Sequence, residues 1–197
     1  QGVRRVFSVP GESFLAALDG LFQSGIENVV CRQEGGAAIM AEAHGKLTGK
    51  PGVLFVTRGP GATNASSGIH VAKHDSTPMV VFVGQVARDH RDRDAFQEVD
   101  FRAMFGPLAK WVAQIDATNR IAEYVRRAFA DDLHSLFIRE ATLIDGDRHR
   151  HRAQWRLLVR CAGGGPGWAG AELRSLRQRQ QLPPRGLHLR GCRCDSL

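Results

Sequence analysis

The sequence has 197 residues, of which 43% are hydrophobic and 24% charged, and its formal net charge at pH 7 is +7. These proportions are typical of a globular protein and exclude a collagen-like repeat or a small disulfide-stapled scaffold. The four cysteines predict no disulfide framework, and no stretch has the roughly 20 consecutive apolar residues that a membrane span needs. With no signal-peptide pattern either, we expect a cytoplasmic protein without a membrane partner.

The composition divides the chain near residue 130. Residues 1–130 contain 15 Lys+Arg and 13 Asp+Glu, whereas residues 131–197 contain 12 Arg, no Lys and 7 Asp+Glu. We therefore expect a folded domain over 1–130 and an atypical, irregular, Arg-rich tail over 131–197. The tail lacks the interleaved aromatic and basic residues of RNA-binding motifs, so a nucleic-acid partner is not expected. A GC-rich gene read out of frame from about residues 128–135 would produce such a tail; a genuine basic arm is the alternative.

The first apolar pattern predicts a helix followed by a strand. The helix is expected to end at Gly25, where a glycine can cap it. Residues 26–31 form a short apolar, β-branched run, which is typical of a strand buried on both faces. The residues that form the apolar face of this first helix are Phe14, Leu15, Leu18, Leu21 and Phe22.

A second helix is expected after Gly35 and Gly36, and residues 48–52 end it. Continuous apolar runs at 53–57 and 78–84 predict two more strands with a helix between them, and another helix begins at residue 121. Strands of continuous hydrophobicity separated by helices predict an α/β fold with an open parallel sheet covered by helices on both faces. The expected apolar face of the second helix consists of Ala37, Met40, Ala41, His44 and Leu47.

The carboxyl ends of parallel strands line the ligand crevice of such sheets. That rule selects the loops at 32–36, 58–64 and 85–101. Glu34 stands out because it ends an apolar strand and precedes two glycines, which is a suitable place for a desolvated carboxyl group with a raised pKa. The other interpretation is that Glu34 stabilises the N-terminus of the following helix, where acidic residues are favoured.

Other motifs predict no cofactor or metal site. Residues 59–64 lack the last glycine of the dinucleotide-binding fingerprint and the Gly-Lys-Ser/Thr of a P-loop, so they read as a tight turn into a helix. His70 and His74 share one helical face, but no third ligand is evident beside them. Cys192 and Cys194 lack a second cysteine pair, so we predict no metal ligands in this chain.

Several short blocks, taken together and in order, carry a resemblance. They are Val6–Ser13, Arg32–Ala37, Met40–Gly52, Thr57–Asn64, Asp75–Pro78, Val83–Gln85 and Ala95–Asp100. Over about residues 3–129 the chain resembles the N-terminal, pyrimidine-binding domain of thiamine-diphosphate-dependent enzymes, most closely those of the acetolactate synthase type. The resemblance stops at the point where the composition changes.

The resemblance implies a role for individual residues. Glu34 matches the glutamate that hydrogen-bonds the cofactor aminopyrimidine, so that the ring can remove the thiazolium proton; this requires a carboxyl group that exchanges a proton near neutral pH. Gln97 is the second residue assigned to catalysis. The other matching positions are Pro60 and Asn64 beside the pyrimidine, Val9 and Gly11 near the reactive face, and Phe96 with Gln97 at the substrate.

The resemblance also implies cofactors and partners. The cofactor would be thiamine diphosphate, and the substrate a 2-oxo acid such as pyruvate. In such enzymes a separate C-terminal domain, usually of a neighbouring subunit, holds the diphosphate and Mg²⁺, so the intact enzyme would be at least a dimer; FAD binding in the full-length enzyme is left open. Asp145–Asp147 only superficially matches the metal segment of that domain. We therefore expect an N-terminal fragment that is inactive alone, with a non-catalytic α/β binding or dimerisation module as the alternative.

Overall fold

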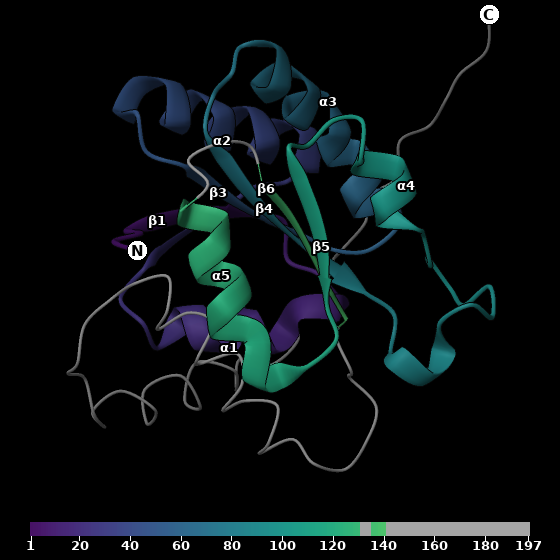
Figure 1. Ribbon diagram of the computed structural model, residues 1–197. Coiled ribbons are helices and arrows are strands. Elements are labelled where there is room, and N and C mark those ends of the chain that lie inside the picture. The colour runs from purple at the N-terminus through teal and green to yellow at the C-terminus, as the bar shows by residue number, and fades with distance from the viewer. Residues whose placement is uncertain (131–134, 141–197) are drawn as a thin grey trace, which may run out of the picture. The chain divides into compact units, whose positions relative to one another are not determined.

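A computed structural model describes residues 1–130 and 135–140 (Figure 1). Six strands and five α-helices alternate along these residues, with three short 3₁₀ turns between them. The strands are β1 (Arg5–Ser8), β2 (Glu27–Val30), β3 (Gly52–Val56), β4 (Met79–Gln85), β5 (Trp111–Ile115) and β6 (Ser135–Glu140). The helices are α1 (Leu15–Phe22), α2 (Glu34–Thr48), α3 (Pro60–His74), α4 (Phe101–Phe105) and α5 (Ile121–Ala130).

All six strands belong to one parallel sheet in the order β2-β1-β3-β4-β6-β5. The register is continuous across the centre, where Leu54 of β3 lies beside Val81 of β4. Because the strands are parallel, the loops that follow them emerge at one edge of the sheet. The predicted α/β fold with an open parallel sheet is confirmed.

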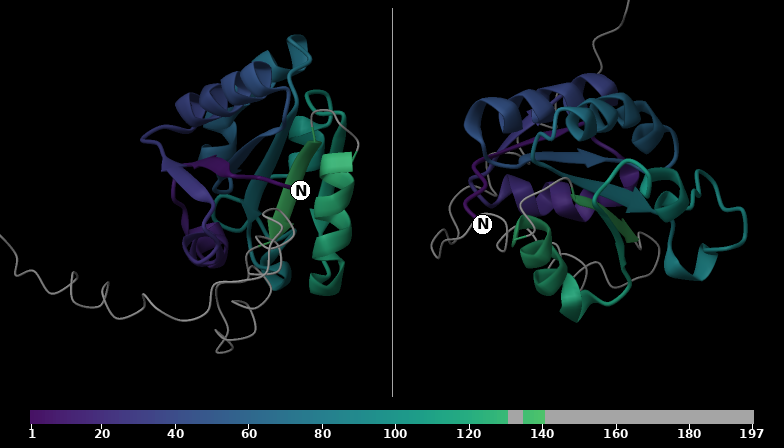
Figure 2. Two further views of the ribbon diagram at one scale, coloured as in Figure 1. Left: turned by 90° about the vertical axis from the view of Figure 1, so that its left-hand side faces the viewer. Right: turned by 45° about the horizontal axis from the view of Figure 1, so that its top comes forward.

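Alternate residues of the central strands supply two cores. Val53 and Phe55 of β3 pack toward α1 and α5, whereas Leu54 and Val56 pack toward α2, α3 and α4. Figure 2 shows these two helical layers on opposite faces of the sheet. Burial on both faces explains why β3 and β4 read as continuous apolar runs.

Small residues let α2 and α3 pack closely, side by side on one face of the sheet (Figure 1). A methyl group built on Gly68 of α3 would lie 2.4 Å from Ala38 Cβ and 2.7 Å from its carbonyl carbon. One built on Gly35 would lie 3.2 Å from the backbone oxygen of Asn64. These glycines therefore let the first part of α2 pack closely against the first half and middle of α3.

The two ends of α2 have defined caps. The Gln33 side chain accepts a hydrogen bond from the Gly36 N–H at 2.8 Å, and Gly49 ends the helix with φ 66°. Near that end, Lys46 pairs with exposed Asp75 and, at 3.3 Å, with buried Glu42. The Thr77 hydroxyl donates to Glu42 at 2.9 Å, so this buried carboxylate has two partners.

Asp75→Asn is expected to lower stability in a pH-dependent way. Lys46 holds the pKa of Asp75 below its usual range through a hydrogen bond and their opposite charges. A lowered folded-state pKa means that the stabilisation is present above the ordinary Asp pKa and is lost as the pH falls through the lowered value. Urea unfolding of both proteins should show a difference at pH 7 that disappears in acid; a difference that persists in acid would contradict this assignment.

Some expected apolar faces are wrong in detail. β2 is an edge strand with half-exposed or exposed residues, because only β1 pairs with it among the described strands, so it is not buried on both faces. On α2, Met40 and Leu47 are 43% and 86% exposed, since the small residues of that helix face the sheet instead. On α1, Leu15 and Phe22 are likewise exposed.

The last strand of the sheet lies beyond residue 130. Residues 135–140 were expected to be irregular, yet they form β6 between β4 and β5, with Phe82 beside Phe137 in the register. A strand that lies between two other strands does not need alternating apolar and polar residues, and that alternation is the usual sequence signal of a strand. The boundary at residue 130 stays a prediction, and the rest of the predicted tail lies outside the described residues. Within the described part, no helix is both long and apolar enough to cross a membrane.

Candidate functional site

The loops that follow β1 and β3 are joined at the carboxyl edge of the sheet. The hydroxyl groups of Ser13 and Thr57 lie 2.8 Å apart, and the Arg58 N–H donates to Ser13 Oγ at 3.3 Å. A methyl group on Gly11 would lie 2.4 Å from Thr57 Cβ, so this close approach requires glycine. The loops after β1 and β3 are therefore held together by direct contacts at this edge of the sheet.

Glu34 and Asn64 meet next to these two joined loops. Glu34 is the half-buried first residue of α2, and its Oε2 accepts a hydrogen bond from Asn64 Nδ2 of α3 at 3.0 Å. Its other oxygen, Oε1, faces Gly61, where an added methyl group would lie only 3.3 Å away. The same methyl group would lie 2.6 Å from the γ-methyl group of Thr57, so glycine at position 61 lets Glu34 and Thr57 both lie close to the start of α3.

The long loop between β4 and α4 reaches the same place. Arg58 Nε donates to the Phe96 carbonyl oxygen at 3.3 Å. Gly59 has φ 55°, and a methyl group there would lie 2.7 Å from Gln97 Cβ. Phe96 itself is 78% exposed. Segments that are 38 residues apart in the sequence thus lie against one another at this edge.

Direct contacts link most of the predicted site residues. Glu34 bonds Asn64, and Gln97 packs against the loop that leads into α3, whose first residue is the exposed Pro60. Gly11 packs on the other side of that loop. Val9 follows β1 at the same edge and packs against the core beneath α2 and α3. The roles assigned to these residues stay predictions.

Two charged residues of this edge were missed. Arg58 has a side chain only 12% exposed and lies 3.9 Å from Glu12, besides its bond to Phe96. Glu98 accepts backbone hydrogen bonds from Asp92 and Ala95 at 2.7 and 2.9 Å. The partners of Arg58 lie far from it in the sequence and those of Glu98 are loop amides, and single-sequence patterns carry no signal for either.

Cys31 also lies at this edge, directly after β2. Burial raises the pKa of its thiol, so the group stays protonated near neutral pH and is a poor nucleophile. Within residues 1–130 and 135–140, no group of three or more His, Cys, Asp or Glu gathers to hold a metal ion. His70 and His74 are exposed, with ring centroids 4.4 Å apart.

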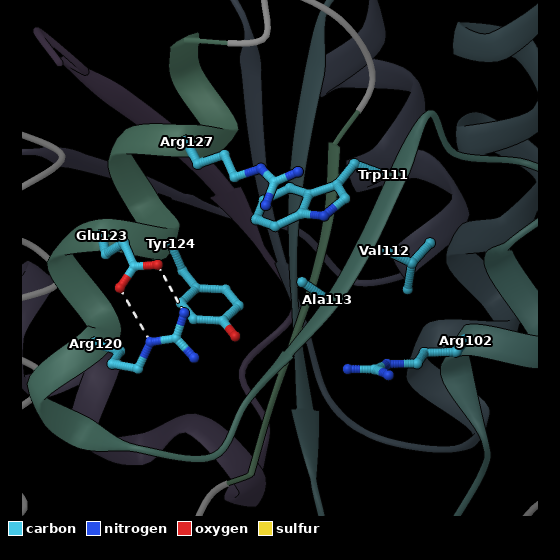
Figure 3. Close-up of a pocket in the computed structure, with 8 residues that line it drawn as sticks. All are labelled: Arg102, Trp111, Val112, Ala113, Arg120, Glu123, Tyr124 and Arg127. Atoms are coloured by element: carbon cyan, nitrogen blue, oxygen red, sulfur yellow. Dashed lines mark hydrogen bonds and ion pairs between the residues drawn. The ribbon is translucent and has the colours of Figure 1, made fainter.

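A cavity of about 210 Å³ lies elsewhere, between α5 and the edge strand β5 (Figure 3). Arg120 makes two hydrogen bonds to Glu123, and the Arg127 guanidinium stacks 4.5 Å from the centre of the Trp111 ring. Arg120, Glu123 and Arg127 thus have partners on α5 and β5, and we assign the functional site to the loop edge, where Glu34 and Asn64 meet. The lining residues are Arg102, Trp111, Val112, Ala113, Arg120, Glu123, Tyr124 and Arg127.

Comparison with known protein families assigns this parallel-sheet chain to one family. The family model described as "Thiamine pyrophosphate enzyme, N-terminal TPP binding domain" matches residues 1–104, which is more than half of the chain. The chain therefore belongs to the thiamine pyrophosphate enzyme family, as the sequence blocks predicted.

Curated relatives narrow the comparison to acetolactate synthases. The chain is 42% identical over 129 residues to acetolactate synthase of Bacillus subtilis, covering 66% of this chain and 23% of that protein. It is also 42% identical over 130 residues to the acetolactate synthase isozyme 3 large subunit of Escherichia coli, with the same coverage. The mitochondrial acetolactate synthase catalytic subunit of Aspergillus candidus matches at 42% over 128 residues. The chain thus matches less than a quarter of the length of these relatives.

Proposed function

We propose that this chain supplies the pyrimidine-binding part of a thiamine-diphosphate-dependent 2-oxo acid decarboxylase or carboligase of the acetolactate synthase type. In this proposal Glu34 is the residue that activates the cofactor aminopyrimidine. The observation that carries it is the Glu34–Asn64 pair at the carboxyl edge of a parallel sheet, in a chain of the thiamine pyrophosphate enzyme family. Family membership supports the cofactor, and the geometry supports the choice of residue.

The residues at this edge fit an aminopyrimidine ring. A carboxyl group is the donor and acceptor that a ring nitrogen and its proton require. Asn64 occupies Oε2 of Glu34, while Gly61 keeps a side chain away from Oε1, so Oε1 is the oxygen we assign to the ring. Pro60 would line the ring from the start of α3, because it lies one residue before Gly61.

The chain's own residues then divide the work. Glu34 Oε1 would give its proton to the pyrimidine ring and take it back, while Asn64 holds the carboxyl group in one orientation. Val9 and Gly11 would shape the reactive face from the loop after β1, and Phe96 with Gln97 would contact the substrate. When bound, thiamine diphosphate supplies the electron sink for breaking and forming the carbon–carbon bond of a 2-oxo acid such as pyruvate.

Other parts of the site would come from elsewhere in the assembly. We propose that a further domain, on a neighbouring subunit, binds the diphosphate through Mg²⁺, which membership in the thiamine pyrophosphate enzyme family supports. The intact enzyme would then be at least a homodimer that acts in the cytoplasm as a transferase or lyase, and FAD would belong to another domain if it binds. This chain would be the N-terminal portion of that enzyme.

Cofactor binding by the purified chain tests the proposal. Titration calorimetry is expected to detect weak binding of thiamine diphosphate, because the chain would bind the ring without neutralising the diphosphate. Glu34→Gln should weaken this binding further, whereas Glu27→Gln on the surface of β2 should not. Release of CO₂ from pyruvate by the chain alone, with cofactor and Mg²⁺, would contradict the need for another domain.

Exposed apolar side chains favour a second candidate, a non-catalytic binding or dimerisation module. Ile39, Met40 and Leu47 of α2 and Val71 of α3 are between 36% and 86% exposed. Large apolar side chains that gather on an exposed surface are typical of protein interfaces. If this candidate is right, the chain dimerises, Leu47→Glu separates the dimer in sedimentation experiments, and Glu34→Gln leaves cofactor titrations without any change.

A further inference from the structure

The loop from residue 86 to 100, between β4 and α4, has an unusual backbone. Asp92, Asp94 and Gln97 have φ values of 59°, 52° and 64°, in the left-handed region that residues other than glycine seldom adopt. Such a conformation is strained and persists only where surrounding contacts impose it. Specific contacts must therefore hold this loop in one conformation.

Glu98 supplies contacts of that kind. Its Oε1 accepts the Asp92 N–H at 2.7 Å, and its Oε2 accepts the Ala95 N–H at 2.9 Å. The Glu98 N–H in turn donates to the Ala95 carbonyl oxygen at 2.8 Å. The backbone amides of Ala95 and Asp92 hold the pKa of Glu98 below its usual range, because they stabilise the charged carboxylate. One side chain thus closes the segment from Asp92 to Glu98 on itself.

The closed segment is also tied to its surroundings at both ends. Arg58 donates to the Phe96 carbonyl oxygen, and Gln97 packs so closely on Gly59 that no side chain fits there. At the other end, Arg91 Nη1 bonds Asp116 Oδ1 at 3.0 Å. The two residues that Glu98 brackets, Phe96 and Gln97, are therefore fixed relative to the loop that leads into α3.

We propose that Glu98 is a positioning residue: its carboxylate fixes the loop conformation that presents Phe96 and Gln97 to the substrate. The proposal rests on the proposed function for the identity of that substrate, a 2-oxo acid, but its structural part concerns the loop alone. Phe96 stays 78% exposed although it is a large aromatic residue, which is consistent with a side chain held out for a ligand rather than for packing. Glu98 acts through Phe96 and Gln97 and is not itself assigned to the chemistry.

Amide hydrogen exchange, followed by mass spectrometry on the whole purified chain, tests the positioning role. Glu98→Ala removes both acceptors and is expected to speed exchange in peptides covering residues 91–98 about tenfold or more, because charge-assisted bonds to two amides are lost. Glu98→Gln keeps one acceptor oxygen and should show a smaller increase. The matched control is Glu123→Gln, since Glu123 is also a paired carboxylate with a lowered pKa but lies on α5.

The outcomes separate local positioning from general stability. Faster exchange confined to residues 91–98, with β3 and β4 unchanged, would support the proposal. Unchanged exchange in Glu98→Ala, an equal increase in Glu123→Gln, or an increase spread over the whole sheet would each overturn it. Trypsin provides a second readout, because cleavage after Arg91 and Arg93 should become faster in the same order of variants.

Cofactor titration of the same variants keeps this proposal apart from the proposed function. The Glu98 carboxylate bonds two amides of its own β4–α4 loop, so both Glu98 variants should bind thiamine diphosphate within about twofold of the unchanged chain. A tenfold loss of binding in Glu98→Gln would contradict the assigned role. Absence of binding by the unchanged chain would instead contradict the proposed function, while the exchange data would still decide the role of Glu98 in the loop.

Discussion

Replacing Glu34 by Gln is expected to lower turnover of pyruvate by about a hundredfold to ten-thousandfold, the range that one acid–base residue contributes. The measurement uses a chimera in which this chain's matching 129-residue segment replaces that of the Bacillus subtilis acetolactate synthase, to which it is 42% identical. Gln keeps the size of Glu34 and its bond to Asn64 but has no proton to exchange. The rate of acetolactate formation is the readout.

Two controls sharpen this experiment. Glu27→Gln changes a surface carboxylate at the start of β2 that pairs with Arg5 of the neighbouring strand β1, and it should leave the rate within about twofold. Asn64→Ala removes the hydrogen bond to Glu34 Oε2 and should reduce the rate by about tenfold, since it only orients the acid. A Glu34→Gln chimera as active as its parent would remove the catalytic assignment.

Gly68→Val is expected to destabilise the chain by about 3 kcal/mol, at the upper end of what overpacking usually costs. The added methyl groups would meet the backbone of Ala38, which cannot turn away as a side chain does. To accept them, α2 and α3 must separate, which would also draw Glu34 away from Asn64. The midpoint of urea unfolding gives the loss of stability, and cofactor titration should show weaker binding.

Gly36→Ala is the matched control on the neighbouring helix. The nearest atom to a methyl group on Gly36 is the Gln33 side-chain oxygen at 4.0 Å, so the change meets no obstacle. It should leave stability unchanged or raise it by about 0.5–1 kcal/mol, because alanine has the higher helix propensity. Equal stability of the two variants would show that the α2–α3 contact is looser than its geometry implies.

Hydrophobic pattern predicted much of the fold. β3 and β4 were recognised because burial on both faces produces uninterrupted apolar runs, and α2 because a glycine pair and a glycine stop bound it. Three strands, β1, β5 and β6, were not predicted. β1 has only four residues, and β5 is half-exposed at the sheet edge, so neither shows a clear pattern of apolar residues in the sequence.

The candidate site was predictable only in part. Glu34 could be found because the strand–loop–helix rule points to the end of an apolar run. Arg58 and Glu98 could not, since each acts through backbone groups whose positions depend on the finished fold. The outward faces of α1 and α2 were misjudged for a related reason: periodicity shows that a helix has an apolar stripe, but small residues such as Ala38 and Gly45 can take the buried side.

The position of β6 has a consequence for biosynthesis. During translation β5 leaves the ribosome before β6, yet among the described strands β5 joins the sheet only through β6. Until residues 135–140 emerge, β4 has an open edge and β5 has no strand to pair with, a state in which nascent chains are prone to wrong associations. Residues 135–140 therefore complete the pairing of the described strands, and a substitution that weakens β6 would also weaken the attachment of β5, which is synthesised before it.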